Sequence, residues 1–407
     1  MSATTPTSLS AIGRRVDDRA NLGRALDELL STRTAPPAVF ALGEPTHGIA
    51  AFPLLRNDIL SELAERGFRS IALEIDFLAA RIVDDYVNGS EAAIDSVLSA
   101  GFSHGFGSIP GNRELVEWLR EYNTGHAPSE RVRFYGFDAP VEYSGAPSPR
   151  SALCALAGRL PRALLPASVA ELDGLLGADS EWTNQAAMFD PSASIGDSDR
   201  ARALRLIADD LADALHRAGP WLHATDPSGY AEAVVHARTA IGLLRYHAAM
   251  ATPGPDRIGS LSSVRSEMMA DNILTIVERE QQRGPTLAFA HNSHLHPRVP
   301  DQPEWNNAGA LAALALGERY LFVATDATPA PVPGTLQGVL AEATTGRALF
   351  PARALGAALS PAIVSAEPIV RGHFPLTIAD LDGADAVVFI TDTDGAQHQY
   401  WLTSSPA

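Results

Sequence analysis

The sequence predicts an α/β protein in which helices flank a central, mostly parallel sheet and a large helical insertion caps the active-site end. Three observations favour this class. Residues 38–77 read as a strand, a polar turn, an amphipathic helix and a second strand. Further short apolar runs of buried-strand type alternate with helical patterns, which is typical of parallel sheets. A long segment in the middle of the chain has an almost entirely helical pattern.

The elements expected along the chain fall into three parts. Residues 1–150 form the first part of the α/β core, with strands at 38–44, 69–75 and 131–138 and helices at 14–31, 52–66, 78–87, 91–98 and 113–123. Residues 151–282 form the helical insertion, with helices at 151–165, 199–219, 230–250 and 264–280. Residues 283–407 complete the core, with strands at 285–290, 320–326, 384–392 and 398–403 and a helix at 308–316.

The composition narrows the classes of partner. The 407 residues carry a formal net charge of −17, so phosphate would be repelled, and neither nucleic acid nor an anionic membrane is expected as the main partner. No apolar run approaches the roughly 18 residues of a membrane helix, and the N-terminus shows no secretory signal. The single cysteine, Cys154, lies among Ala and Leu and is expected to pack in the core. We expect a cytoplasmic protein.

Polar residues stand at or just after the ends of four predicted strands. Because ligands bind at the carboxyl ends of parallel strands, we expect one shared site there. The candidates are Glu44 and His47 after the first strand, Glu74 and Asp76 at the second, Asp138 at the third, and His291 and His294 in the run "HNSHLHP".

The strongest chemical candidates are His47 and Glu44. A histidine with a pKa near neutrality can take a proton from water, and a nearby carboxylate can orient it or hold the substrate. Glu74 is expected to face the same site, because a carboxylate at the end of an apolar strand is costly to bury without a partner. His291 and His294 suit a second acid or base, an oxyanion donor or metal ligands.

Other residues have plausible structural readings. Asp76 could cap the following helix. Arg56 and Arg265 could each bind an oxyanion or carboxylate, or make a surface salt bridge worth little. The run "GFSHG" matches the G-x-S-x-G pattern of a nucleophilic serine, but no strand precedes it, so Ser103 is not expected to be a nucleophile.

Taken in order, the motifs "GEPTHG", an arginine, "GFRSIALEIDF", "YGFDAP" and "AHNSHLHP" resemble the erythromycin esterase family over about residues 39–324. The resemblance implies an α/β core with an inserted helical region and a metal-independent hydrolase without a cofactor, in which a histidine activates water against a lactone carbonyl. Matched by motif, the family's catalytic positions fall on Glu44, His47, Arg56, Glu74 and His291, with His294 as the second late histidine.

The sequence departs from the family pattern at several positions. Ala51, Phe77 and Ser266 stand where many relatives carry an acid, a tryptophan and an aspartate. The loop "GFSHGFG" lacks the expected tryptophan, and we expect it to carry His104 near the ligand instead. These changes spare the proposed base and both core carboxylates but leave the substrate open.

We therefore expect an esterase or lactonase acting on a small-molecule natural product, macrolide-like or otherwise, in resistance or biosynthesis. In this hypothesis His47 is the base, Glu44 and Glu74 orient it, and Arg56 and His291 position the substrate or stabilise the oxyanion. The alternatives are a metal hydrolase with His47, Glu74, His291 and His294 as ligands, a tailoring enzyme, or a protein that binds a compound without converting it.

Overall fold

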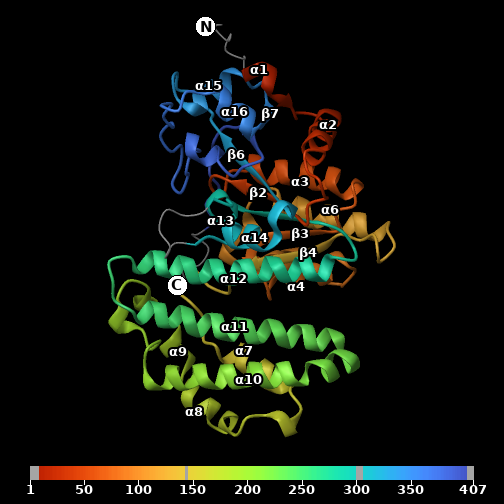
Figure 1. Cartoon of the computed structure of the whole chain (residues 1–407). Helices are drawn as coiled ribbons and strands as arrows, with labels where there is room; N and C mark the ends of the chain where they lie inside the picture. The colour runs from red at the N-terminus through yellow and green to blue at the C-terminus, as the bar shows by residue number, and fades with distance from the viewer. Residues whose placement is uncertain (1–8, 143–144, 299–305, 401–407) are drawn as a thin grey trace. The chain divides into compact units, whose positions relative to one another are not determined.

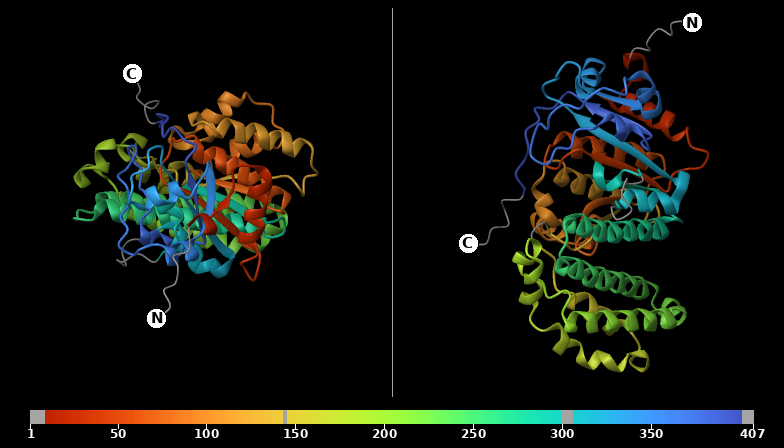
Figure 2. Two further views of the ribbon diagram at one scale, coloured as in Figure 1. Left: turned by 90° about the horizontal axis from the view of Figure 1, so that it is seen from above. Right: turned by 60° about the vertical axis from the view of Figure 1, so that its left-hand side comes forward.

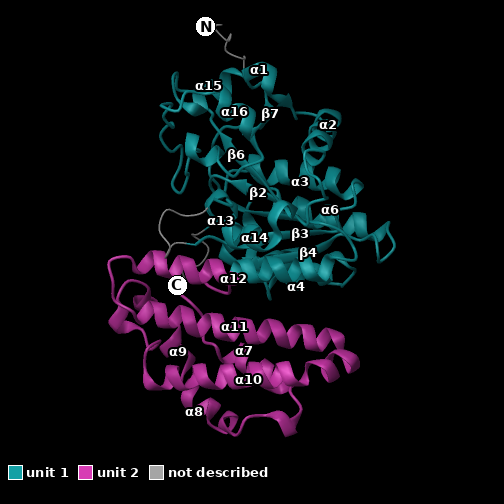
Figure 3. Ribbon diagram, viewed as in Figure 1, with its two compact units in different colours: residues 1–138, 269–300, 306–407 teal, residues 139–268, 301–305 magenta. Residues whose placement is uncertain are grey.

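The computed structural model describes residues 9–142, 145–298 and 306–400 (Figure 1). The chain divides into two units, drawn in different colours in Figure 3. Among the described residues, the first contains 9–138, 269–298 and 306–400, and the second contains 139–142 and 145–268. Helix α12 (Arg257–Glu280) contributes residues to both units.

The first unit is built on an eight-stranded sheet, which confirms the predicted fold class. Its order is β1-β7-β8-β6-β2-β5-β3-β4. All neighbours from β8 to β4 pair in parallel, whereas β7 runs antiparallel to β8 and β1 antiparallel to β7. The strands are β1 (Arg14–Arg15), β2 (Val39–Glu44), β3 (Ser70–Asp76), β4 (Arg133–Asp138), β5 (Thr286–His291), β6 (Tyr320–Ala327), β7 (Arg347–Pro351) and β8 (Ala386–Ile390).

Helices cover both faces of this sheet, as the two views of Figure 2 show. Those of the first part are α1 (Leu9–Ile12), α2 (Arg19–Leu30), α3 (Ala51–Glu65), α4 (Ala80–Val87), α5 (Ile94–Gly101) and α6 (Asn112–Thr124). Those that follow β5 are α13 (Asn292–Leu295), α14 (Ala308–Leu316), α15 (Leu336–Glu342) and α16 (Ala352–Ala358).

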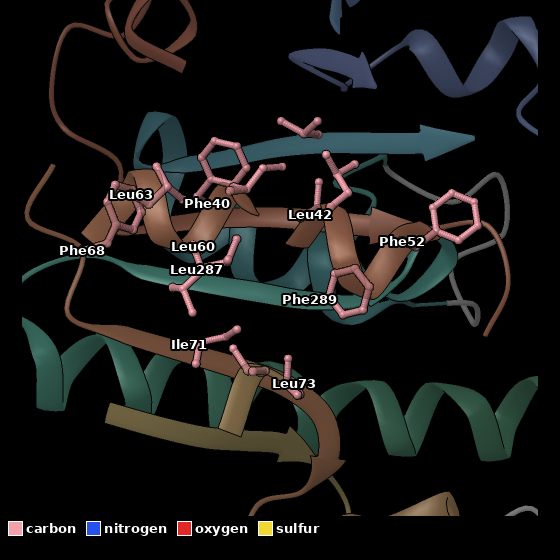
Figure 4. Packing of buried hydrophobic residues seen from close by; sticks show 14 of the residues in the cluster. Phe40, Leu42, Phe52, Leu60, Leu63, Phe68, Ile71, Leu73, Leu287 and Phe289 are labelled. Carbon is pink, nitrogen blue, oxygen red and sulfur yellow. The ribbon is translucent and has the colours of Figure 1, made fainter. Parts of the chain in front are cut away.

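The core of the first unit lies between α3 and the central strands. Alternate residues of a strand face the same side of a sheet, so Phe40 and Leu42 of β2 both reach the layer under α3. There they meet apolar side chains that recur at helical spacing on α3, among them Leu60 and Leu63 (Figure 4). Burying each such side chain stabilises the fold by roughly 1.5–3 kcal/mol. This packing holds α3 against the face of β2.

The second unit is helical. Its elements are α7 (Arg150–Arg159), α8 (Leu172–Leu176), α9 (Asp179–Trp182), α10 (Asp199–Thr225), α11 (Pro227–Ala251) and the first half of α12. Helices α10 and α11 form a hairpin that turns at Asp226, and α7 packs beside it around a shared leucine- and alanine-rich core (Figure 1).

Three expectations about local structure are wrong. Cys154 is exposed, because α7 turns its neighbours Leu153 and Leu156 toward the core and leaves Cys154 on the outer face. The strand β7 lies in a stretch where none was expected. No strand forms over residues 398–400, and the rest of the strand expected at 398–403 lies outside the described residues.

Among the helices described, none is both long and apolar enough to cross a bilayer.

Candidate active site

Four adjacent strands bring the candidate residues to one edge of the sheet. The order β2-β5-β3-β4 places their carboxyl ends side by side. Glu44 pairs in register with His291, and Asp76 with Asp138. Residues separated by up to about 250 positions in the chain therefore share one end of the first unit.

Two glycines shape the turn after β2. A Cβ at Gly43 would lie 2.1 Å from Oδ1 of Asn292, so only glycine lets β2 approach the turn after β5 this closely. Gly48 has φ +87°, in the left-handed region that glycine adopts without strain. Between them the chain presents Glu44 at the strand end and His47 within the turn.

His47 and Glu44 form a hydrogen-bonded pair. Nδ1 of His47 lies 2.8 Å from Oε1 of Glu44, so the ring donates from Nδ1 and leaves Nε2 as the basic nitrogen of the neutral imidazole. Within the described part of the chain, Oε2 of Glu44 has no hydrogen-bond partner. Burial raises the pKa of Glu44, although the contact with His47 acts in the opposite direction.

Glu74 lies on the other side of His47. Its Oε2 is 3.7 Å from Nε2 of His47 and accepts a 2.9 Å hydrogen bond from the backbone N–H of His291, while its Oε1 is 3.2 Å from Nε2 of His294. Burial alone would lower the pKa of His47, but the charges of Glu74 and Glu44 outweigh burial and raise it. The carboxylates of Glu44 and Glu74 thus flank one imidazole whose side chain is 18% exposed.

His291 is bonded at both ring nitrogens. Its Nε2 donates to the carbonyl of Pro45 at 2.9 Å, and its Nδ1 accepts from the backbone N–H of Ser293 at 3.1 Å. Burial and the nearby charges of His47 and His294 lower the pKa of His291 to about 3. The ring is therefore neutral at ordinary pH and ties the first turn to the end of β5.

Arg56 is buried on α3, and the hydrogen bonds that it makes to described residues are all to uncharged groups. Its guanidinium donates to the side chains of Asn57 and Asn112 and to the carbonyl of Gly111. Burial lowers its pKa to about 9, and the charge of Glu44 opposes that shift. Arg56 therefore supplies positive charge near the Glu44–His47 pair while holding the loop before α6.

Asp76 and Ser103 have local structural contacts. One oxygen of Asp76 accepts from the backbone N–H groups of Leu78 and Ala79 at 2.7 and 3.1 Å, which holds the turn before α4; the N-cap residue of α4 is Ala79, so Asp76 is not the cap itself. The hydroxyl of Ser103 accepts from the backbone N–H of Asp76 at 2.9 Å. Burial raises the pKa of Asp76, and Asp138 adds to this.

His104 forms a second pair with a carboxylate. Its Nε2 lies 2.8 Å from Oδ2 of Asp138, whose side chain is fully buried at the end of β4. His104 has φ +60° and is the only residue other than glycine with positive φ in the described part of the chain. The ring lies 5.2 Å from that of Phe106, which in turn lies 4.8 Å from His47.

His296 is the third histidine of the run "HNSHLHP". The ring nitrogens of His296 bond to the carbonyl of Asp380 and the backbone N–H of Arg298, so this residue fixes a loop. Arg265 lies on α12 in the second unit, and its role at the site stays a prediction.

Phe106 and the C-terminal segment join the site without any sequence signal. The ring of Tyr400 lies 6.2 Å from His47 and 5.1 Å from Phe106. Burial, together with the charges of Glu44 and Glu74, raises the pKa of Tyr400 to about 12, so the phenol keeps its proton. The side chain of Gln397 donates to the carbonyl of His47 at 2.9 Å.

The geometry of the cluster gives no ready metal site. Among the described residues, no group of three or more His, Cys, Asp and Glu side chains is arranged to hold a metal ion. Of the four proposed ligands, His291 already uses both ring nitrogens in hydrogen bonds within the protein.

The comparisons with known proteins agree with one another on the fold. A crystal structure of a protein from Bacillus cereus is 17% identical, covers 94% of this chain and 95% of its own, and has a TM-score of 0.70. A histidine-to-asparagine mutant of the erythromycin esterase EreC in its open conformation is 19% identical, with coverage of 93% and 95% and a TM-score of 0.67. A succinoglycan biosynthesis protein is 14% identical, with coverage of 95% and 96% and a TM-score of 0.63.

The family assignment comes from the sequence itself. No curated protein matches the chain closely enough to be significant. The family model described as erythromycin esterase matches residues 63–353, which include Glu74 and the late histidines, while Glu44, His47 and Arg56 precede the matched range. This chain belongs to the erythromycin esterase family, which implies an esterase-like hydrolase.

Proposed function

We propose that the protein hydrolyses an ester or lactone bond of a small natural product, with water activated by His47. The observation that carries this proposal is the position of His47 between two buried carboxylates. Its Nδ1 is hydrogen-bonded to Oε1 of Glu44 at 2.8 Å, and its Nε2 lies 3.7 Å from Oε2 of Glu74.

The mechanism follows from this placement. With Nδ1–H donated to Glu44, Nε2 of the neutral ring can accept a proton from water as the water oxygen attacks the carbonyl carbon. The imidazolium that forms is stabilised by Glu44 on one side and Glu74 on the other. Positioned proton transfer of this kind contributes a rate factor of about 10²–10⁴.

The other candidates take supporting roles. His294 contacts Glu74 at 3.2 Å and is partly exposed, which suits a contact with the substrate. Arg56 acts by holding the loop before α6 and through its positive charge near Glu44, and His291 acts by holding the first turn, because both side chains are already bonded within the protein. Asp76 acts through the turn before α4 and Asp138 through His104. Arg265 remains a proposed substrate contact.

One experiment separates this proposal from its alternatives. Purified protein is incubated with a panel of macrolactones and activated esters, before and after treatment with a chelator, and the compounds are identified by mass spectrometry. We expect products that have gained one water and a rate that the chelator leaves unchanged. A compound recovered intact from the protein would indicate binding without turnover. Activity lost to the chelator and restored by zinc or manganese would indicate the metal hydrolase.

Two variants complete this design: His47→Ala, which removes the proposed base, and His216→Ala as its control. His216, on α10, is an exposed histidine outside the cluster and gives a matched control. We expect His216→Ala to hydrolyse the same compounds at the wild-type rate. We further propose that the protein acts in the cytoplasm, in resistance or in biosynthesis.

A further inference from the structure

Residues 366–376 form an irregular segment between α16 and β8 that lies against the turn after β2. The backbone N–H of Phe374 in this segment donates to the carbonyl of Pro45 at 2.9 Å. The side chain of Gln397 donates to a backbone carbonyl of the segment at 3.0 Å and to the carbonyl of His47 at 2.9 Å. The segment is therefore bonded to the turn that carries the proposed base, both directly and through one side chain.

A buried polar network holds this segment in place. Asp326 on β6 and His373 are both buried, and Oδ1 of Asp326 lies 3.0 Å from Nε2 of His373. The other oxygen, Oδ2, accepts from the backbone N–H of Leu376 at 2.9 Å and from the amide of Gln337 at 2.8 Å. The amide oxygen of Gln337 in turn accepts from the backbone N–H of Ala366 at 2.8 Å. Because buried polar groups are costly to leave without partners, this network fixes both ends of the segment.

The side chain of Phe374 points outward from this fixed segment. His373 is only 3% exposed, whereas the next residue, Phe374, is 64% exposed. The ring of Phe374 nevertheless lies 5.3 Å from the ring of His291, edge to face. A single exposed aromatic ring is ordinary on a protein surface. This one differs because a buried network holds it beside the histidines of the candidate site.

Other aromatic rings border the proposed base. The rings of Phe106 and Tyr400 lie 4.8 and 6.2 Å from the ring of His47. On another side, the ring of His291 lies 5.6 Å from that of His47 and carries Phe374 against it. The site thus combines a few polar groups with apolar surface, which is typical of pockets that bind small, largely apolar molecules.

We propose that Phe374 is a specificity-determining residue that contacts a bulky apolar group of the substrate. This inference rests on the proposed hydrolase function. The phenyl ring takes no part in proton transfer, so it contributes binding energy alone, through apolar area that the substrate covers. Only a substrate large enough to reach the ring gains this energy. The preferred substrate is therefore an ester or lactone with a large apolar acyl or alcohol portion.

The test compares short and long members of two ester series. One series lengthens the acyl group of 4-nitrophenyl esters from acetate to octanoate, and the other lengthens the alcohol of acetate esters from methyl to octyl. In Phe374→Ala we expect kcat/KM on the long member of at least one series to fall about 10-fold, through KM, because roughly 50 Å² of apolar contact is lost. The short members should keep their wild-type values.

Two further variants control this comparison. Phe374→Leu keeps most of the apolar area, so its loss on the long ester should be less than about 3-fold. Leu314 is an 85% exposed apolar residue near the end of α14, just before β6 begins and hence toward the opposite edge of the sheet. We expect Leu314→Ala to match the wild type on every ester.

The possible outcomes separate this inference from the proposed function. A ratio of long-ester to short-ester kcat/KM that Phe374→Ala leaves unchanged in both series would overturn the specificity role while the hydrolase function stands. Equal losses on short and long esters would also overturn it, because the ring would then act by supporting His291. A wild-type protein that hydrolyses none of these esters and no lactone of the panel would overturn the proposed function and this inference together.

Discussion

Burial and the charges of neighbouring carboxylates act in opposite directions on the pKa of His47, and their balance determines how strong a base the ring is. Burial disfavours the charged ring, whereas Glu74 and Glu44 favour it, and the carboxylates prevail. A base of this kind is strong enough to accept a proton from water and is stabilised once it has done so. The same two carboxylates would have little effect on a fully solvated histidine, because water would screen them.

Replacing Glu44 by Gln removes one of these charges while keeping an acceptor for Nδ1–H. The pKa of His47 should then fall, so the acidic limb of the pH–rate profile should move to lower pH. The rate on the plateau should also fall, by about 10-fold to 10⁴-fold, because the imidazolium is less stabilised. The measurement is kcat against pH, with Glu28→Gln on exposed α2 as the control. An acidic limb that stays in place would argue against the coupling of the two residues.

The low pKa of the buried His291 ring leads to a prediction about the pH dependence of stability. Its pKa is about 3 in the folded protein against an unfolded value of 6.5, so between these pH values the unfolded chain binds a proton that the folded chain does not. Stability should therefore be lost as the pH falls below 6.5, by roughly 1.4 kcal/mol per pH unit at most from this group. Urea unfolding of His291→Gln from pH 6.5 to 4.5 should show a shallower dependence than wild type or His216→Gln. Identical slopes would contradict the buried, neutral ring.

At the level of elements, the site depends on close contact between the turns after β2 and β5. Asn292 follows β5; its amide donates to the carbonyl of Thr325 on β6, and the hydroxyl of Thr325 donates to the carbonyl of Gly43 on β2. These bonds hold three strand ends together. They leave no room for a side chain at residue 43.

A methyl group at this contact should be costly. In Gly43→Ala the Cβ would lie 2.1 Å from Oδ1 and 2.9 Å from Cα of Asn292, so backbone must move and the free energy of unfolding should drop by about 1–3 kcal/mol. Gly158→Ala is the matched control, since nothing lies within 4 Å of its Cβ on helix α7, where alanine should stabilise by up to about 1 kcal/mol. Urea denaturation measures both. A Gly43→Ala protein as stable as wild type would mean that the two turns are not in contact.

For the whole molecule, the parallel sheet and its polar strand ends could be predicted because each depends on local pattern. An apolar run followed by Glu44, Glu74, Asp138 or His291 marks a buried strand and its carboxyl end without knowledge of any partner. The strand pairing then brings these residues together.

Contacts made by irregular segments could not be predicted in this way. Tyr400 and Phe106 reach His47 through loops, for which periodicity carries no information. One of the two hydrogen bonds of the His291 ring goes to the carbonyl of Pro45. The direction of a backbone carbonyl cannot be seen in a pattern of side chains, so this bond could not be predicted. The exposure of Cys154 could not be predicted, because a helix rich in Ala and Leu does not show which of its faces is covered.

The most direct test of the central claim is the kcat/KM of His47→Ala beside wild type and His216→Ala, on a substrate that the wild type hydrolyses, with folding checked by circular dichroism. We predict that His47→Ala retains the fold and loses at least about 100-fold in kcat/KM, while His216→Ala matches wild type. A folded His47→Ala protein that hydrolyses the substrate within a few-fold of wild type would contradict the account.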